Sequence, residues 1–302
     1  MGKAWFDASH EAREVFHAAD RYLADRLGAS LTEICFNGPV DRLNRTDVSQ
    51  PAIFTASYAC WRGLIAKWGM GDGEAEIIAA AGLSLGEYTA LTIAGAMSFE
   101  DGLELVTLRG RAMQDAAEKS QGGMVALIGA DEAQAQQVCE KARGSDILVC
   151  ANFNAPGQIV ISGSKSACER ALPVASELGL RGTALQVAGA FHSPLMQPAA
   201  DQLRAALADT TIKTPRATVV CNVTALPHDL TDAAPDSIRR RLVEQLTSPV
   251  RWSQSCSWLI SNRNKPTEHG EVEWHELSPG KTLSGLMRRI DKSIKVVSDD
   301  AP

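Results

Sequence analysis

The chain has 302 residues, of which 45% are hydrophobic and 22% charged, with a formal net charge of −6 and an isoelectric point near 5.6. This length and composition are those of a globular protein with a large core, and the acidic balance argues against a surface that binds nucleic acid or anionic membranes. No run approaches the ~18 apolar residues that a membrane span needs, and the first residues lack an apolar signal core, so we expect a cytoplasmic protein.

Seven cysteines are scattered along the chain without a C-x-x-C pair. An odd number without such spacing indicates reduced thiols rather than a disulfide framework or a zinc site. The six histidines show no metal-ligand spacing either. We therefore expect no structural or catalytic metal.

The first part of the chain predicts two helices, then a strand and a third helix. Apolar residues recur at helical spacing over residues 9–27 and 51–68, and Pro51 fits the first turn of the second helix. Residues 77–81 form a short apolar run of the buried-strand type, and residues 87–93 continue as a helix.

A glycine-flanked serine, Ser84 in G-L-S-L-G, lies between this strand and helix. The pattern G-x-S-x-G arises by chance in about one chain in ten of this length, so its setting matters more than its letters. Strand, tight turn and helix are the setting of a nucleophile elbow, and the helix start directs free N–H groups at a forming oxyanion. Ser84 is therefore a candidate nucleophile, and the alternative is a glycine-rich turn with an idle serine.

One arginine lies on the apolar face of a helix predicted over residues 101–119. At about 100° per residue, Arg109 falls in the middle of the apolar arc, between Val106 and Met113. A buried guanidinium stays protonated and needs an anion. Either Arg109 pairs with an internal carboxylate, or its stem reaches outward, or the anion arrives with the substrate, whose carboxylate would match the planar arginine fork.

The middle of the chain changes to short strands and two helices. The predicted strands cover residues 124–129, 147–153, 158–163 and 182–187, and the helices cover residues 131–141 and 164–178. The order β-α-β-β-α-β is that of a ferredoxin-like unit. We expect this unit to be a smaller domain inserted after residue 122, with chain crossings at Gly123 and at residues 188–190.

The larger α/β domain resumes after the insertion. Its expected helices cover residues 194–208, 237–246, 250–262 and 281–291, and its expected strands cover residues 217–223 and 272–277. The predicted division is thus residues 1–122 for the first part of the large subdomain, 123–188 for the small one, and 189–302 for the second part of the large one.

A serine nucleophile needs a base, and the histidines are its candidates. Four fall on a polar helix face or in polar, loop-like stretches and are expected in solvent: His10, His17, His228 and His269. His275 falls in a strand-like run, where a core or edge position is the default. His192 lies where the inserted domain rejoins the large one, and such junctions form clefts, so His192 is the candidate base.

Six motifs follow one another in a recognisable order. They are G-L-S-L-G-E-Y around Ser84, L-R-G-R-A-M-Q around Arg109, N-F-N-A-P-G-Q-I-V-I-S-G at 152–163, G-A-F-H-S-P-L-M at 189–196, S-P-V-R-W at 248–252 and E-L-S-P-G-K-T-L at 276–283. Together they resemble the malonyl-CoA:acyl carrier protein transacylase family over residues 3–291. Six ordered motifs are far more specific than one pentapeptide.

The resemblance implies an α/β-hydrolase-like large subdomain with an inserted ferredoxin-like small subdomain. It implies that Ser84 attacks the malonyl thioester and that His192 acts as base, then as acid toward the departing CoA thiol. Arg109 would bind the free malonyl carboxylate, and Leu85 N–H would be one oxyanion donor. The family has no triad carboxylate, and the carbonyl that orients its histidine is expected here near residues 248–251.

By the same resemblance, the malonyl group would pass from Ser84 to the phosphopantetheine thiol of acyl carrier protein, in a ping-pong reaction that supplies fatty acid synthesis. The expected partners of a monomeric enzyme are thus malonyl-CoA and acyl carrier protein. Leu85 after the serine and Phe191 before the histidine match malonyl-using members, whereas methylmalonyl-using ones carry Gln and Ser there. Phe191 is expected to fill the space that an α-methyl group would need.

Three departures from the family pattern stand out. Leu83 replaces a common histidine, with little loss expected, and Ser278 stands where G-P-G is usual. The family begins with a strand and G-Q-G-x-Q, whose glutamine N–H is the second oxyanion donor, whereas this chain begins M-G-K-A-W. We expect that the sequence starts at an internal methionine of a longer protein or is a shortened form, and a missing leader would leave a plastid or mitochondrial location open.

Three other functions stay open from the sequence. A Ser–His hydrolase of neutral esters would have no use for Arg109. A non-catalytic chain that binds CoA or a carrier protein would fit the missing leader, but it would not need Ser84 and His192. An acyltransferase of a polyketide-type pathway would share the chemistry and use another carrier.

Overall fold

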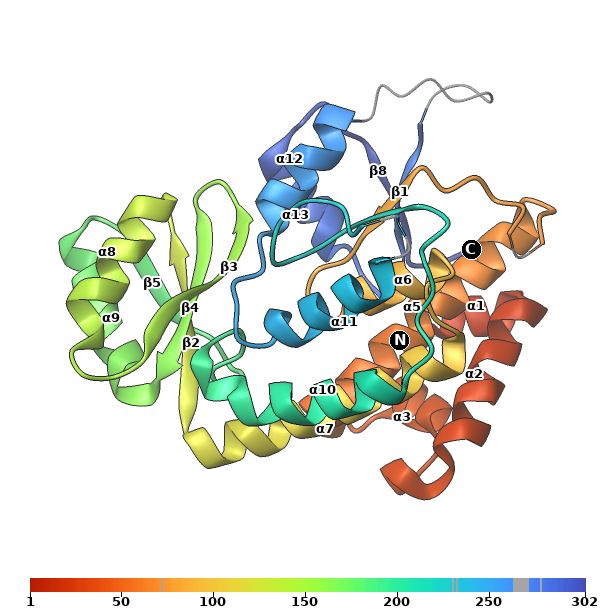
Figure 1. Cartoon of the computed structure of the whole chain (residues 1–302), viewed down its shortest axis with the longest axis horizontal. Coiled ribbons are helices and arrows are strands. Elements are labelled where there is room, and N and C mark those ends of the chain that lie inside the picture. Colours follow the sequence, from red (N-terminus) through yellow and green to blue (C-terminus); the bar gives the residue numbers. More distant parts are fainter. Residues whose placement is uncertain (72, 230, 232, 263–271, 278) are drawn as a thin grey trace.

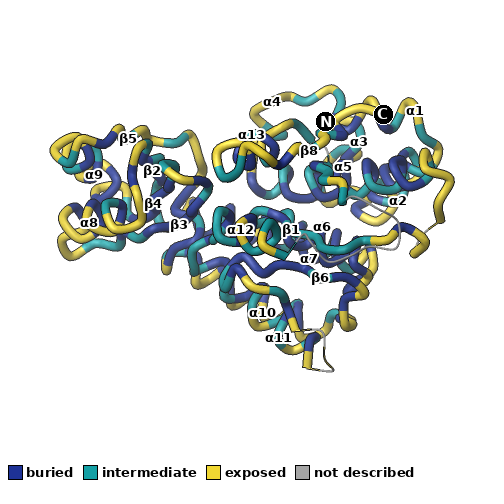
Figure 2. Tube along the Cα trace, turned by 90° about the horizontal axis from the view of Figure 1, so that it is seen from above, coloured by how far each residue is buried: buried dark blue, intermediate teal, exposed yellow. Residues whose placement is uncertain are grey.

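The computed structural model describes the whole chain except residues 72, 230, 232, 263–271 and 278. It is a mixed α/β fold with two lobes of unequal size (Figure 1). Both termini lie in the larger lobe. Figure 2 shows buried chain inside each lobe, and the buried apolar side chains form separate clusters in the two.

Helices make up most of the larger lobe. They are α1 (Lys3–Ala8), α2 (His10–Leu23), α3 (Leu31–Asn37), α4 (Val40–Leu43), α5 (Thr46–Lys67), α6 (Gly86–Ile93), α7 (Phe99–Ser120), α10 (Gln197–Asp209), α11 (Ala234–Gln245), α12 (Trp252–Asn262) and α13 (Thr282–Ile290), with 3₁₀ turns η1 (Ala24–Leu27) and η2 (Pro194–Met196). The strands of this lobe are short and pair in parallel: β1 (Ala79–Ala81) with β6 (Thr218–Val220), and β7 (Trp274–Leu277) with β8 (Val296–Asp299).

The smaller lobe is a four-stranded antiparallel sheet with two helices. Its elements are β2 (Gly122–Ile128), α8 (Glu132–Arg143), β3 (Leu148–Ala155), β4 (Gln158–Ser164), α9 (Lys165–Glu177) and β5 (Arg181–Ala184). The strand order is β3-β4-β2-β5, and α8 and α9 cover one face of the sheet (Figure 1). The predicted alternation of strands and helices is therefore present in full, with ends shifted by a few residues.

Local sequence explains where several helices begin and end. Ser9 accepts a hydrogen bond from Ala12 N at the start of α2, and Asp131 and Gln134 form a reciprocal capping box at the start of α8. Gly28 takes a left-handed conformation after the predicted first helix, at the end of η1. These ends agree with the sequence because the signals lie within one turn of the boundary.

The start of α5 was predicted wrongly. The helix begins at Thr46, so Pro51 lies inside it rather than in its first turn. A side chain of α7 stabilises the real N-terminus, because Gln114 Oε1 accepts a hydrogen bond from Thr46 N at 3.3 Å. This contact joins residues 68 positions apart, and local sequence signals do not reveal it.

Several short elements were not predicted from periodicity. They are α1, α3, α4 and β8, each of four to seven residues and too short to show a full apolar repeat. Strand β1 was expected to be buried, yet its three residues are only half-buried.

The two chain crossings between the lobes lie against each other. A Cβ on Gly122, at the start of β2, would come within 2.5 Å of the Ala190 Cβ, and a Cβ on Gly189 would come within 2.4 Å of the Ala117 Cβ near the end of α7. The outgoing strand therefore packs closely against the segment that leads to His192.

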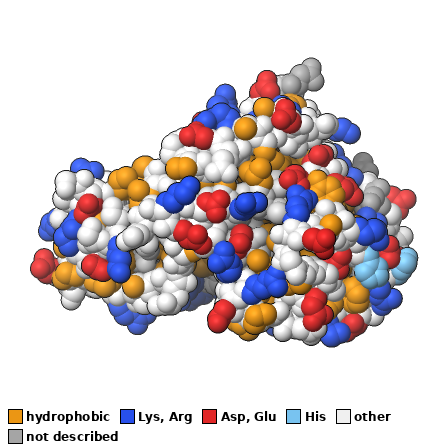
Figure 3. Space-filling view, turned by 90° about the horizontal axis from the view of Figure 1, so that it is seen from below, with side chains coloured by type: hydrophobic (Ala, Val, Ile, Leu, Met, Phe, Trp, Pro, Cys, Tyr) orange, Lys and Arg blue, Asp and Glu red, His pale blue; other side chains and the backbone are white. Residues whose placement is uncertain are grey.

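The surface agrees with the modest net charge. Acidic and basic side chains are interspersed over the face shown in Figure 3, without a broad field of one sign. Among the residues that the structure describes, no helix is both long and apolar enough to cross a membrane. All seven cysteines are buried and unbridged.

Candidate active site

Ser84 occupies a strained turn between β1 and α6. Its φ is +53°, in the left-handed region that non-glycine residues rarely adopt. Gly82 is required there, because a Cβ at this position would come within 1.9 Å of the Gly86 backbone. A Cβ on Gly86 would meet nothing within 4 Å. Of the two flanking glycines, only Gly82 is therefore required by close packing of the turn.

An asparagine from another part of the chain holds this elbow in place. Asn222, just after β6, accepts a hydrogen bond from Ser84 N at 2.6 Å and donates one to Gly82 O at 2.7 Å. The sequence analysis did not single out Asn222. The parallel pairing of β1 and β6, which brings it beside the elbow, is a tertiary contact.

The structure brings His192 to Ser84. The distance from Ser84 Oγ to His192 Nε2 is 2.9 Å, and His192 Nδ1 lies 2.8 Å from Gln245 O. The orienting carbonyl was expected at residues 248–251 but belongs to Gln245, the last residue of α11. The final carbonyls of a helix have no partner within the helix, which is why one is free to accept from Nδ1.

His192 is neutral at physiological pH. It is 4% exposed, and burial is the main cause that lowers its pKa to about 4, assisted by the positive charge of Arg109. The Gln245 carbonyl acts in the opposite direction because it favours the protonated ring. With Nδ1–H donating to that carbonyl, Nε2 is left to accept the Ser84 proton.

Arg109 is buried beside Ser84. Its guanidinium donates from Nη1 to Gln50 Oε1 at 2.7 Å, and from Nη2 to Gln245 Oε1 and Ser84 Oγ, both at 2.9 Å. It also lies over the Tyr88 ring, 5.5 Å from the centroid. Within the described residues it has no direct carboxylate partner, and at 1% exposure its stem does not reach outward. Of the alternatives open from the sequence, an anion supplied with the substrate fits this environment.

Leu85 and Phe191 flank the serine and the histidine. Leu85 is buried and precedes the first residue of α6, and no partner for its N–H is found among the described residues. Phe191 is half-buried and packs against the core of the larger lobe and also against a small cluster of sheet residues that includes Met124 and Val160. It thus lies between the two lobes.

The remaining histidines agree only in part with the burial expected from the sequence. His10 is exposed, and His17 is partly exposed beside Glu14. His275 lies in β7 and bonds Asp299 of β8 at 2.9 Å, which confirms a strand position. His269 lies outside the described residues.

His228 was expected in solvent, and this is wrong. It is 3% exposed, and its Nε2 lies 2.7 Å from Glu87 Oε1. The chain after β6 doubles back so that Pro227 pairs with Val220, and this return carries a polar stretch into the interior. Nothing local in the sequence signals that turn.

Three buried side chains, Glu87, Cys221 and His228, have ligand atoms within 4.8 Å of one another, as a metal site would require. Both Glu87 oxygens, however, already accept hydrogen bonds from protein N–H groups. The cluster is therefore explained as a hydrogen-bond network.

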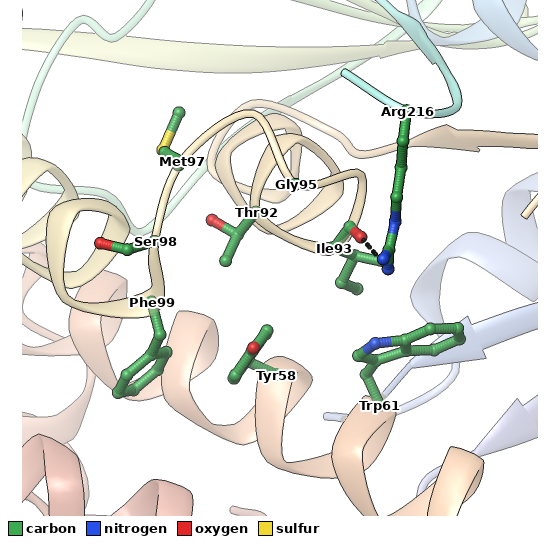
Figure 4. Close-up of a pocket in the computed structure, with 9 residues that line it drawn as sticks. All are labelled: Tyr58, Trp61, Thr92, Ile93, Gly95, Met97, Ser98, Phe99 and Arg216. Atoms are coloured by element: carbon green, nitrogen blue, oxygen red, sulfur yellow. Dashed lines mark hydrogen bonds between the residues drawn. The ribbon is translucent and has the colours of Figure 1, made fainter. Parts of the chain in front are cut away.

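A cavity of about 210 Å³ lies at the other end of α6 (Figure 4). Its lining includes Tyr58, Trp61 and Arg216, and the Arg216 guanidinium is engaged by Ile93 O at 3.0 Å. Thr92 and Ile93 at the end of α6 line it, so about six helical residues, roughly 9 Å of helix, lie between this cavity and Ser84. Ser84, His192 and Arg109 do not line it, so it is distinct from the candidate active site.

Comparisons with known proteins agree with this geometry. A family model described as the acyl transferase domain matches residues 1–267. The malonyl CoA-acyl carrier protein transacylase of Salmonella typhimurium is 40% identical over 265 residues, which cover 87% of this chain and 81% of that protein.

Solved structures give the same result. The acyl-carrier-protein S-malonyltransferase of Bartonella henselae matches with a TM-score of 0.90 and 37% identity, covering 100% of this chain and 91% of the other. A malonyl-transacylase solved in complex with a type II polyketide acyl-carrier protein matches with a TM-score of 0.88 and 34% identity. The match covers 100% of this chain and 92% of the other. The chain therefore belongs to the malonyl-CoA:acyl carrier protein transacylase family of acyl transferases.

Proposed function

We infer that this chain is an [acyl-carrier-protein] S-malonyltransferase, which moves malonyl from malonyl-CoA to the phosphopantetheine thiol of acyl carrier protein for fatty acid synthesis. The observation that carries the proposal is the contact of one hydroxyl, Ser84 Oγ, with both His192 Nε2 and Arg109 Nη2 at 2.9 Å. Nucleophile, base and a buried cation thus meet at one atom. The substrates suffice for the reaction, which needs no cofactor.

In the first half-reaction, Ser84 Oγ attacks the malonyl thioester carbonyl while its proton passes to His192 Nε2. The Gln245 carbonyl, 2.8 Å from Nδ1, stabilises the imidazolium that results. Collapse of the tetrahedral intermediate breaks the C–S bond, and the CoA sulfur leaves with the proton from His192. Malonyl-Ser84 and CoA-SH are the products.

The second half-reaction reverses these roles. The phosphopantetheine thiol gives its proton to His192 and attacks the malonyl-Ser84 ester, and Ser84 recovers its proton as the C–O bond breaks. Leu85 N–H, at the start of α6, is the oxyanion donor that this chain supplies in both halves.

Arg109 is the residue that selects a malonyl group over an acetyl group. The far end of a malonyl ester on Ser84 carries a carboxylate, and a guanidinium already in contact with Oγ is suitably placed to meet it. Phe191 beside His192 restricts the acyl pocket and disfavours an α-methyl group. A hydrolase of neutral esters would gain nothing from a buried arginine at this place.

The proposed division places the first part of an α/β-hydrolase-like subdomain in residues 1–122, a ferredoxin-like insertion in 123–188, and the second part in 189–302. The strand order β3-β4-β2-β5 supports the ferredoxin-like assignment of the insertion. The close packing of Gly122 on Ala190 supports boundaries near these residues. A monomer is the oligomeric state we propose.

Mass spectrometry of the intact protein tests the function. After incubation with malonyl-CoA, the expected result is a malonyl adduct on Ser84 that holo acyl carrier protein removes. Absence of that adduct would exclude the transferase function, and release as free malonate without carrier would favour a hydrolase. An acyl carrier protein from a polyketide pathway is the second carrier to try, because a malonyl-transacylase with such a partner shares this fold.

A further inference from the structure

The carboxylate of Glu87 is buried beside the catalytic groups, although it touches no reacting atom. It lies in the first turn of α6 and its side chain is completely buried. Oε1 accepts from His228 Nε2 at 2.7 Å, and Oε2 accepts from Gln245 Nε2 at 2.7 Å and Asn222 N at 3.1 Å. Since all three partners present N–H groups, they require a side chain that accepts at both of its oxygens, which a carboxylate does.

This carboxylate determines which way the Gln245 amide faces. Gln245 Nε2 donates to Glu87 Oε2 and, at 3.0 Å, to Ser84 O, and this leaves Oε1 to accept from Arg109 Nη2 at 2.9 Å. In the flipped orientation, an amide N–H₂ would face the guanidinium and an oxygen would face the carboxylate. Both contacts would be repulsive, so Glu87 and Arg109 together allow a single orientation.

The Gln245 amide thereby bridges two opposite buried charges. Glu87 attracts Arg109 electrostatically, although no direct contact joins them. A direct ion pair would occupy the guanidinium N–H groups that a substrate carboxylate needs. Separation by one amide balances the charge of Arg109 in the free enzyme and leaves Nη2 beside Ser84 Oγ.

We propose that Glu87, held by His228, is a positioning residue for recognition of the acyl carboxylate. It orients the Gln245 amide, whose Oε1 in turn holds Arg109 beside Ser84. The inference rests on the proposed function, in which Arg109 binds the malonyl carboxylate. It predicts that Glu87 affects malonyl transfer more strongly than acetyl transfer.

The test compares acylation of Ser84 by malonyl-CoA and by acetyl-CoA, followed by rapid quench and intact mass. In Glu87→Gln, kcat/KM for malonyl-CoA is expected to fall about 10- to 100-fold, because a neutral amide holds Gln245 less firmly than a carboxylate. The kcat/KM for acetyl-CoA is expected to fall about threefold or less, since the acetyl group has no carboxylate for Arg109 to bind. Glu169→Gln, on the exposed side of α9, is the charge-matched control and should leave both rates unchanged.

The malonyl-to-acetyl ratio separates positioning from a merely structural role. If Glu87 only supported the fold, both rates would fall together and the ratio would stay at the wild-type value, which would overturn the inference. Arg109→Ala is measured alongside. If the wild type shows no malonyl preference, or if Arg109→Ala retains that preference, the proposed function fails as well. Both of these proteins keep Glu87, so a failure of the proposed function can be told apart from a failure of the inference about Glu87.

A second pair of variants tests the same inference if the Glu87→Gln protein does not fold. His228→Leu removes the donor to Glu87 Oε1, whereas His228→Gln keeps an amide N–H that can donate there. The leucine variant is expected to lower the malonyl-to-acetyl ratio by about threefold or more, and the glutamine variant to restore it. Equal ratios in the two variants would contradict the role given to Glu87.

Discussion

At the scale of single residues, three side chains meet at one oxygen. Ser84 Oγ lies 2.9 Å from both His192 and Arg109, and the last two are almost fully buried. Burial lowers the pKa of the histidine and raises the energetic cost of a guanidinium without a direct counter-charge. Under the proposed function, the neutral histidine can accept the Ser84 proton and the guanidinium can bind an anionic acyl group.

Removal of the Arg109 guanidinium should lower the preference for malonyl-CoA over acetyl-CoA more than it lowers the rate at which Ser84 is acylated by acetyl-CoA. In Arg109→Ala, acylation by malonyl-CoA is expected to fall about 100-fold, because charge-assisted hydrogen bonds to the malonyl carboxylate are lost. Acylation by acetyl-CoA should persist, since Ser84 and His192 are unchanged. The measurement is the rate of adduct formation with each thioester. A parallel loss with both would show that Arg109 supports the site in general.

The pKa of His192 makes a prediction about pH. The ring must be neutral to accept a proton, and its pKa is lowered from near 6.5 to about 4, so the base stays competent as the pH falls below 6.5. The acid limb of kcat/KM for malonyl-CoA is therefore expected near pH 4, with tryptophan fluorescence recorded in the same buffers to verify folding. A limb near pH 6.5 in folded protein would contradict the lowered pKa.

At the scale of elements, the elbow depends on how closely α6 returns over β1. Gly82 permits the approach, and the Asn222 side chain bonds both Gly82 and Ser84. The positive φ of Ser84 is thus sustained by hydrogen bonds to a segment more than a hundred residues away.

Gly82 and Gly86, the two glycines that flank Ser84, provide a variant and its matched control. Gly82→Ala places a Cβ 1.9 Å from backbone and should lower the free energy of unfolding by about 3 kcal/mol, together with the acylation rate. Gly86→Ala meets nothing within 4 Å and lies in a helix, so stability should stay equal or rise by about 1 kcal/mol. Urea unfolding of both variants checks this. Similar losses in the two would mean that the contact at Gly82 does not limit the turn.

At the scale of the whole molecule, the smaller lobe lies between the two parts of the chain that lead to Ser84 and to His192. The chain leaves the larger lobe after α7 and returns through residues 188–190 to His192. Gly122 and Ala190 touch where the two crossings pass. We therefore expect the position of the small sheet and the position of His192 to be linked through this contact.

A substitution at this crossing should affect activity from a distance. Gly122→Ala would bring a Cβ within 2.5 Å of the Ala190 Cβ, and we expect it to lower stability by about 1–3 kcal/mol and to reduce acylation through a displaced His192. Gly123→Ala, one residue along, meets only the Cys168 side chain, at 3.8 Å from Sγ and 4.0 Å from Cβ, and is the control. Thermal unfolding and adduct formation are measured for both, and equal behaviour would contradict the link.

The sequence by itself determined the elements with strong local signals and the family of the protein. Helical periodicity and the alternation of strands and helices predicted most elements, and the position of Arg109 on an apolar helix face indicated a buried charge. The order of six motifs indicated the family, and the comparisons confirmed it. These features are readable because each element, motif or misplaced charge lies within one short segment of the chain.

Only the tertiary structure decided what supports those residues. It showed that Gln245, rather than residues 248–251, orients His192, that His228 is buried against Glu87, and that Asn222 holds the elbow. Each contact joins segments that are 53 to 141 positions apart. Hydrogen bonds over such separations depend on how strands pair and where helices end in space, and no local pattern in the sequence encodes them.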